Sequence, residues 1–181
     1  MAQYRHDRAV PIQRPHSLMT NAPLIASLER AVGAENVFGG SSDLLVYEYD
    51  GSVDAAVETS KPAAVVLPQT VEQVAEVVRI ARANKLPIVP RGAGTGLSGG
   101  SVAQSGGVVV ALTRMARILE VDYENRIALV EPGVINLELS DWVKPGGYFF
   151  APDPSSQRAC TIGGNVAENS GGPHTLKYGV T

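Results

Sequence analysis

PRGAGTGLSGGS, residues 90–101, contains five glycines and matches three different functional motifs. Residues 94–99 match the GxGxxG fingerprint of a dinucleotide-binding Rossmann unit, and residues 94–101 match a P-loop that lacks its lysine. Residues 96–100 match the GxSxG turn that carries the nucleophile of a hydrolase. Because each motif belongs to a different chemistry, at most one of them accounts for the glycines.

The residues around this stretch argue against all three motifs. A Rossmann fingerprint and a hydrolase turn both lead into a helix, whereas the residues after Gly99 have no helical periodicity and precede an apolar run at 108–112. Gly100 stands where a P-loop has its lysine. Glu120 and Asp122 follow at about the distance of a ribose-binding acid, so an NAD(P)-binding Rossmann dehydrogenase remains the first alternative. A hydrolase is the least favoured.

A glycine-rich loop without a helix can still bind an anion through its backbone. Glycine allows positive φ angles and close approach, so that successive N–H groups turn toward one point. Residues 92–107 contain seven glycines, and the hydroxyls of Thr95 and Ser98 and the charge of Arg91 lie in or beside this segment. The pattern is typical of either a diphosphate-binding loop or a flexible surface connection.

A second tract of small residues, 151–172, favours the diphosphate-binding interpretation. Residues 151–156, APDPSS, predict a rigid turn with two hydroxyls, and residues 161–172, TIGGNVAENSGG, place small side chains and amides where a flat ligand could lie. Two such walls in one domain predict a long cofactor with a central diphosphate and a planar head. Neither wall has a cluster of charged residues, so the chemistry would belong to the cofactor.

The sequence before the glycines predicts a β–α–β unit. Apolar runs at 62–68 and 86–90 are typical of buried strands, and residues 71–81 repeat valine and alanine at helical spacing. Thr70 and Gln73 form a capping box at the start of this helix. Because the connection crosses over through a helix, we expect the two strands to be a parallel pair.

The sequence after the first glycine tract predicts a hairpin and a helix. Residues 118–122 and 127–131 are expected to pair as the hairpin, separated by a polar turn. Residues 136–144 are expected to form a short amphipathic helix with Trp142 in the core.

Three parts of the chain are distinguished by composition. Residues 1–20 are expected to be a mobile or loosely docked arm, residues 21–60 a helical and turn-rich lead-in, and residues 61–181 the main domain. The lead-in contains a predicted helix at 22–32 and a short apolar run at 44–47 that is either a strand or a docked loop.

Composition narrows the possible partners. The chain has 181 residues, 44% of them apolar, and a net charge of −3, so nucleic acid is a poor candidate. The one cysteine, Cys160, allows no internal disulfide and no cysteine-based metal motif. No run approaches the roughly 18 apolar residues of a membrane helix, and no signal peptide is recognisable at the start. We therefore expect a cytoplasmic protein without an integral membrane segment.

The order of five motifs, PRGAGTGLSGG, EPG, PDPSS, TIGGNVAENSGG and HTLKYGVT, resembles the PCMH-type FAD-binding domain of the vanillyl-alcohol oxidase superfamily. More closely, it is similar to the glycolate oxidase catalytic subunit and the FAD-linked D-lactate and D-2-hydroxyglutarate dehydrogenases. The resemblance implies an α+β fold of two small α/β subdomains, a parallel β–α–β piece and a mostly antiparallel sheet, with FAD between them. It also implies an amino-terminal fragment, because the second subdomain is incomplete and the cap domain that binds substrate is absent.

The resemblance assigns cofactor contacts by position. The pyrophosphate would be cradled by Pro90, Arg91, Gly92, Ala93, Gly94, Thr95, Gly96, Leu97, Ser98, Gly99 and Gly100, with Pro132 and Gly133 along the same channel. The ribityl chain and the flavin ring would be faced by Pro152, Asp153, Pro154, Ser155, Ser156, Thr161, Ile162, Gly163, Gly164, Asn165, Ala167, Glu168, Asn169, Ser170, Gly171 and Gly172. Tyr178 and Gly179 complete the set, and His174 is a candidate group near the flavin edge, with a histidine satisfied by nearby backbone as the alternative.

The function implied by the resemblance is oxidation of a 2-hydroxy acid, of the glycolate or D-lactate type, by hydride transfer to FAD. Thr95 stands where relatives with covalent flavin carry a histidine, so the FAD is expected to be noncovalent. The metal-ligating and proton-abstracting histidines of such enzymes lie outside this sequence, so the fragment alone is expected to hold no metal and to be inactive. Iron–sulfur partner subunits are compatible with the resemblance, and a non-catalytic flavin- or nucleotide-binding module is a further alternative.

Overall fold

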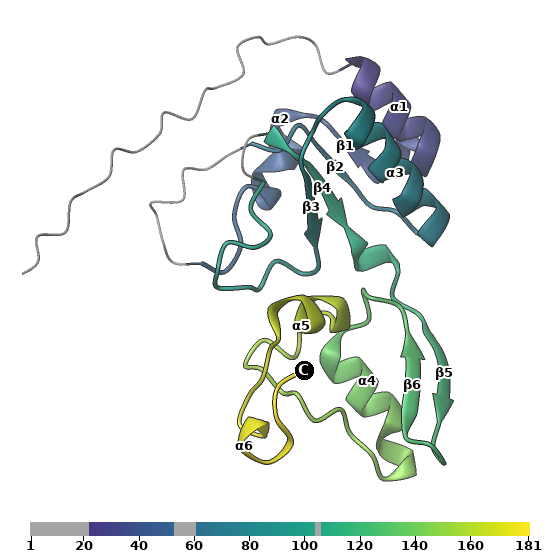
Figure 1. The fold of residues 1–181 in the computed structure, drawn as a ribbon, viewed down its shortest axis with the longest axis vertical. Coiled ribbons are helices and arrows are strands. Elements are labelled where there is room, and N and C mark those ends of the chain that lie inside the picture. Colours follow the sequence, from purple (N-terminus) through teal and green to yellow (C-terminus); the bar gives the residue numbers. More distant parts are fainter. Residues whose placement is uncertain (1–21, 53–60, 104–105) are drawn as a thin grey trace, which may run out of the picture.

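The computed structural model describes residues 22–52, 61–103 and 106–181 (Figure 1). The expected arm at 1–20 and part of the lead-in, 53–60, lie outside the described residues. The rest forms an α+β fold with a four-stranded mixed sheet in a first subdomain, residues 22–114, and a two-stranded sheet in a second, residues 115–181. The predicted fold class is confirmed.

The first subdomain is built around a sheet with the strand order β1-β2-β4-β3. Its elements are α1 (Ala22–Val32), the 3-10 turn η1 (Ala34–Asn36), β1 (Val37–Phe38), α2 (Ser41–Leu44), η2 (Leu45–Tyr47), β2 (Ala64–Val66), α3 (Val71–Ala83), β3 (Ile88–Arg91), β4 (Val108–Ala111) and η4 (Leu112–Arg114). Strand β4 pairs in parallel with β2 on one side and with β3 on the other, while β1 pairs antiparallel with β2. The two predicted strands therefore run parallel, as expected, but they are not neighbours.

The composition of the strands explains this order. All four residues of β4 are buried, which suits a strand covered on both faces at the centre of a sheet. Strand β3 contains Pro90, which has no N–H for a ladder and is tolerated at an edge. Sequence periodicity identifies both strands but carries no information on which one lies in the middle.

Each face of this sheet has its own hydrophobic core. On one face, α1 and α3 lie side by side and bury Leu28, Val77 and Val108 completely (Figure 1). On the other face, Val65 and Val109 pack with Leu44 and, at the edge of the cluster, Tyr47. Residues 44–47 are therefore helical turns that cover the sheet, so the docked loop is the better of the two predictions and the strand is wrong.

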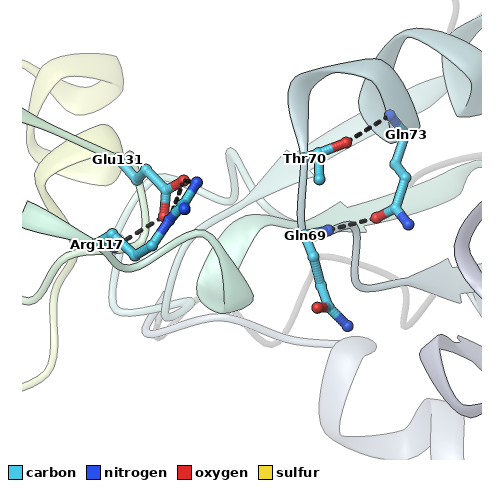
Figure 2. A network of polar contacts seen from close by, with 5 residues as sticks. All are labelled: Gln69, Thr70, Gln73, Arg117 and Glu131. Atoms are coloured by element: carbon cyan, nitrogen blue, oxygen red, sulfur yellow. Dashed lines mark hydrogen bonds and ion pairs between the residues drawn. The ribbon is translucent and has the colours of Figure 1, made fainter. Parts of the chain in front are cut away.

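Helix α3 begins at its predicted cap. The hydroxyl of Thr70 accepts a hydrogen bond from the N–H of Gln73 at 3.3 Å, and the Gln73 side chain accepts one from the N–H of Gln69 at 2.7 Å (Figure 2). The reciprocal pair satisfies two N–H groups at the helix start. Asn84 ends the helix as predicted.

The second subdomain contains a hairpin and three helices. Its elements are β5 (Ile118–Asp122), β6 (Ile127–Val130), α4 (Asn136–Val143), η5 (Lys144–Gly146), α5 (Ile162–Glu168) and α6 (Thr175–Tyr178). Val134, Leu139 and Val143 form a core with the inner face of the hairpin and with Ile162. The predicted hairpin and the helix from Asn136 are confirmed.

Trp142 is not a core residue, contrary to the prediction. Its side chain is 60% exposed because Leu139 and Val143, four residues apart, form the buried stripe of α4. Position 142 is rotated about 100° from position 143 around the helix axis, which turns it toward solvent. Within the described part of the chain, no helix is long and apolar enough to cross a membrane.

Candidate functional site

A cavity of about 430 Å³ lies between the two glycine-rich tracts. One side is the glycine loop, residues 92–101, which follows β3. The opposite side is the second wall, residues 154–171, which contains α5. The predicted site residues that line the cavity are Pro90, Gly92, Ala93, Gly94, Thr95, Gly96, Leu97, Gly100, Pro154, Ser155, Ser156, Thr161, Gly164, Asn165, Ala167, Glu168, Ser170 and Gly171.

Other residues of the predicted set do not line the cavity. They are Arg91, Ser98, Gly99, Pro132, Gly133, Pro152, Asp153, Ile162, Gly163, Asn169, Gly172, His174, Tyr178 and Gly179. The cavity also contains Ser101 and Cys160, which the resemblance did not assign. Cys160 is buried and is a small packed residue of the second wall.

The glycine loop contains turns and bends but no helix in residues 92–103. Gly94 and Gly99 have φ angles of +72° and +74°, which favour glycine. A side chain on Gly92 would overlap Thr161 of the second wall, so the two walls approach closely at this point. The helix that a Rossmann phosphate site needs does not follow Gly99 within these residues.

Arg91 does not line the cavity. Its guanidinium donates to the carbonyl oxygen of Tyr49 at 2.9 Å and reaches the carbonyl oxygens of Val46 and Ser101 at 3.4 Å. It also lies over the ring of Tyr47, 5.4 Å from the centroid. Burial lowers the pKa of Arg91, and the nearby Asp50 carboxylate opposes that effect. The Arg91 guanidinium, which was predicted to lie beside the diphosphate, therefore holds the base of the glycine loop in place.

Residues 46–52 support the glycine loop from behind. A Cβ built on Gly51 would lie 3.0 Å from the carbonyl oxygens of Thr95 and Gly96, so the two segments are in close backbone contact. Burial favours the neutral form of Asp50, but hydrogen bonds from Ser52 and Ser101 and the charge of Arg91 outweigh it and hold the pKa of Asp50 below its ordinary value. The sequence analysis predicted no site residue in this segment. The one sequence feature that could have indicated it is the polar run YEYDGS at 47–52.

The second wall is fixed by the start of α5. Thr161 is buried and caps the helix, accepting a hydrogen bond from the N–H of Gly164 at 3.2 Å. The N–H of Gly163 donates to the carbonyl oxygen of Pro132 at 2.8 Å. A Cβ on Gly163 would lie 2.7 Å from the Cβ of Pro132, so only glycine allows this contact. The predicted EPG motif thus supports the second wall from outside the cavity.

An ion pair holds the EPG motif in place. The guanidinium of Arg117 donates to Oε1 of Glu131 at 2.7 Å, and the backbone N–H of Arg117 donates to Oε2 at 2.8 Å (Figure 2). These hydrogen bonds and the charge of Arg117 outweigh desolvation and hold the pKa of Glu131 below its ordinary value. The pair joins the start of β5 to the residue before Pro132.

Two polar groups of the second wall have no hydrogen-bond partner among the residues that the structure describes. Nδ2 of Asn165 and Oγ of Ser170 are buried and unpaired, and both residues line the cavity. An unsatisfied buried polar group destabilises a fold by about 1–3 kcal/mol, so such groups call for a partner. A ligand with polar atoms along this wall would supply one, and a glycine loop opposite would supply backbone donors to an anion. The residues present therefore fit a long cofactor with a phosphate-containing linker.

Asp153 and His174 form a pair at the edge of this wall. Oδ2 of Asp153 lies 2.7 Å from Nδ1 of His174, and Oδ1 accepts from the backbone N–H of His174 at 3.1 Å. Burial raises the pKa of Asp153, but the two hydrogen bonds and the charge of His174 outweigh it, so the pKa lies below its ordinary value. The imidazole also contacts the rings of Phe149 and Tyr178. It is thus held by a side chain rather than by nearby backbone.

Charged groups are scarce around the cavity. Among the described residues that line it, Glu168 is the one Asp, Glu, Lys, Arg or His. In the described ranges, no group of three or more His, Cys, Asp or Glu residues could hold a metal ion. The site therefore offers backbone, hydroxyl and amide contacts, which position a cofactor but carry out little acid–base chemistry themselves.

Comparison with protein families gives one match, to the FAD binding domain, over residues 62–181. The glycolate oxidase subunit GlcD of Escherichia coli (strain K12) is 44% identical over 158 residues, which is 87% of this chain and 31% of that protein. The D-lactate dehydrogenase of Anaerostipes hadrus is 42% identical over 122 residues, or 67% of this chain and 26% of that protein. The chain thus spans about a third or less of these curated relatives.

Solved structures share the same fold. Alkyldihydroxyacetonephosphate synthase superposes with a TM-score of 0.77 at 22% identity, over 94% of this chain and 33% of that one. At this level of identity the likeness concerns the arrangement of helices and strands alone.

Proposed function

The chain belongs to the FAD-binding domain family, and from this membership we propose that the cavity between the glycine loop and the second wall holds FAD. The observation that carries the proposal is the convergence of a glycine loop and two unpaired polar groups on one cavity. Its volume of about 430 Å³ lies in the range of ligand sites. In this proposal, residues 61–181 are the cofactor-binding domain, and residues 21–60 are a lead-in whose described segment, 22–52, packs against it.

The residues have distinct roles in holding the cofactor. N–H groups of the glycine loop and the hydroxyl of Thr95 would bind the diphosphate, since backbone donors can hold an anion without a cationic side chain. Asn165 and Ser170 would supply polar contacts from the second wall. Thr95 offers no imidazole for a covalent link, so the FAD would be held noncovalently.

We further propose that the protein containing this chain oxidises a 2-hydroxy acid of the glycolate or D-lactate type. The support is the activity named for two relatives at 44% and 42% identity. Bound flavin would accept the hydride that leaves the α-carbon of the hydroxy acid. This chain's own residues would hold the cofactor, orient it, and stabilise negative charge with N–H donors, which is the protein's electrostatic contribution in such sites.

Substrate contacts are proposed to lie elsewhere in the full reading frame. The chain covers 31% of the GlcD relative, and its described residues contain no cluster suited to a metal or to substrate deprotonation within the cavity. That relative is named as a subunit, and we propose that this protein too works with partner subunits. Iron–sulfur subunits would be suitable electron acceptors. A cytoplasmic location stays a prediction.

Anaerobic reduction of the flavin tests the activity. The full reading frame that carries this chain is reconstituted with FAD and mixed with glycolate, D-lactate or L-lactate without oxygen. Loss of the oxidised flavin absorbance with glycolate or D-lactate is the expected result. Retention of FAD together with no bleaching by any 2-hydroxy acid would refute the proposed activity while leaving the cofactor site intact.

A further inference from the structure

Glu168 stands out in the cofactor cavity because its charge has the wrong sign for a phosphate site. It is the one Asp, Glu, Lys, Arg or His among the residues that line the cavity. The remaining lining residues are glycines, prolines, alanines, hydroxyl residues, one amide, one leucine and one cysteine. No lysine, arginine or histidine is among the described residues that line the cavity, so no lining side chain offsets this carboxylate.

The side chain of Glu168 reaches from the second wall to the glycine loop. A Cβ built on Gly100 would lie 2.6 Å from Oε1 of Glu168, and one built on Gly96 would lie 3.9 Å from the same atom. The carboxylate therefore lies beside the loop that is proposed to bind the diphosphate. The guanidinium of the arginine next to this loop, Arg91, is engaged by the carbonyl oxygens of Tyr49 and Ser101, and Arg91 does not line the cavity.

The secondary structure gives no reason for an acid at this position. Glu168 is the last residue of α5, whose last turn contains no basic residue. A negative charge near the C-terminus of a helix is unfavourable, because that end carries the negative pole of the dipole. We therefore look for the role of Glu168 in ligand binding and not in the stability of α5.

We propose that Glu168 is a charge-selectivity residue of the cofactor cavity, which disfavours ligands that carry more phosphate charge than the diphosphate of a dinucleotide. The inference rests on the proposed FAD site. A nest of N–H groups binds any anion, so on its own it would also accept nucleoside triphosphates. The repulsion from one fixed carboxylate grows with the charge of the ligand, so Glu168 weakens triphosphate binding more than FAD binding. Such repulsive elements are a common source of specificity.

The test compares Glu168→Gln with wild type in the full reading frame. Three ligands are titrated: FAD, ATP as a competitor that displaces FAD, and riboflavin, which carries no phosphate. Glu168→Gln is expected to bind FAD about threefold and ATP about tenfold more tightly, with riboflavin unchanged, as Coulomb repulsion in a partly exposed site predicts. The gain should shrink at high salt.

Glu138→Gln is the matched control. Glu138 lies on α4, is exposed and lines a different cavity, so the substitution changes the net charge by the same amount without touching the cofactor cavity. It is expected to leave all three affinities unchanged. An equal gain in ATP binding in both variants would mean that total charge, not Glu168, sets the selectivity.

Other outcomes would overturn the proposal in distinguishable ways. Weaker binding of both FAD and riboflavin by Glu168→Gln would mean that the carboxylate accepts a hydrogen bond from a ligand hydroxyl. An unchanged ratio of ATP to FAD affinity would mean that it has no role in selectivity. If wild type binds neither FAD nor riboflavin, the proposed cofactor site itself fails.

Discussion

The guanidinium of Arg91 donates a 2.9 Å hydrogen bond to the carbonyl oxygen of Tyr49, which lies 42 positions earlier in the chain. The same group reaches the carbonyl oxygen of Ser101 at 3.4 Å, so it ties both ends of the glycine loop to the segment behind it. The planar guanidinium presents five donors in a fixed fork and can reach carbonyl groups on separate segments, whereas a lysine presents three donors from a single nitrogen. The conformation of the loop is thus set from the side opposite the cavity.

Replacing Arg91 should therefore loosen the loop. Arg91→Met keeps an unbranched apolar stem but removes the guanidinium donors and leaves buried carbonyl groups unpaired. We expect a loss of about 2–3 kcal/mol in the free energy of unfolding and at least a tenfold weaker FAD affinity. Urea denaturation and FAD titration measure the two effects. Arg91→Lys should recover part of the stability but little of the affinity, and wild-type FAD binding by Arg91→Met would contradict this role.

For the unpaired hydroxyl of Ser170 we expect no loss of stability on substitution, in contrast to Arg91. Because Oγ is buried and has no partner in the described chain, Ser170→Ala removes an unsatisfied polar atom and should raise the free energy of unfolding of the FAD-free protein by about 1–3 kcal/mol. FAD affinity should fall by about two- to tenfold, the worth of one hydrogen bond. Thermal denaturation without FAD and titration with FAD separate the two. Unchanged affinity would show that the hydroxyl makes no contact with the cofactor.

Adjacent glycines of α5 provide a matched pair. A methyl group on Gly163 would meet Pro132, whereas one on Gly164 would meet only Oγ1 of Thr161, at 3.2 Å. Gly163→Ala should lower the free energy of unfolding by about 1–3 kcal/mol, as overpacking does. Gly164→Ala should lower the free energy of unfolding by less, because its methyl group meets only one side-chain atom and alanine favours the helix over glycine. Equal losses in urea denaturation would mean that the Pro132 contact does not fix α5.

The Asp153–His174 pair predicts a dependence of stability on pH. Since the pKa of Asp153 is lowered by folding, its ionised form stabilises the fold above the ordinary carboxyl pKa of about 4, and this contribution is lost as the pH falls through the lower folded value. Asp153→Asn lacks the contribution. The difference in unfolding free energy between wild type and Asp153→Asn should therefore be largest near neutral pH and shrink below about pH 4. A difference that stays constant from pH 7 to pH 3 would exclude this linkage.

Local sequence patterns account for most of the secondary structure. The run of β-branched residues in β4, the capping box of Thr70 and Gln73, and the hairpin around Tyr123 all depend on neighbours close in sequence, and all three were predicted. The order of strands was not, because it depends on which strand can be buried on both faces. Trp142 was misplaced for a similar reason, since its helix has apolar residues on more than one side.

The two walls of the candidate site could also be predicted, because glycine and small residues cluster visibly in both tracts. Contacts between distant segments could not. Nothing local to Arg91 indicates that its charge faces Tyr49 instead of a phosphate, and nothing local to Gly51 indicates that it packs against Thr95. The role of Glu168 likewise appears only when α5 is placed opposite Gly100.

Retention of flavin by the purified protein tests the central claim most directly. The full reading frame that carries this chain is mixed with FAD, desalted, and examined by absorption spectroscopy before and after acid precipitation. The account predicts flavin bands that survive desalting and then appear in the acid supernatant, as expected for noncovalent FAD. Flavin that remains in the pellet would contradict the argument from Thr95, and a protein without flavin after desalting would contradict the cofactor site itself.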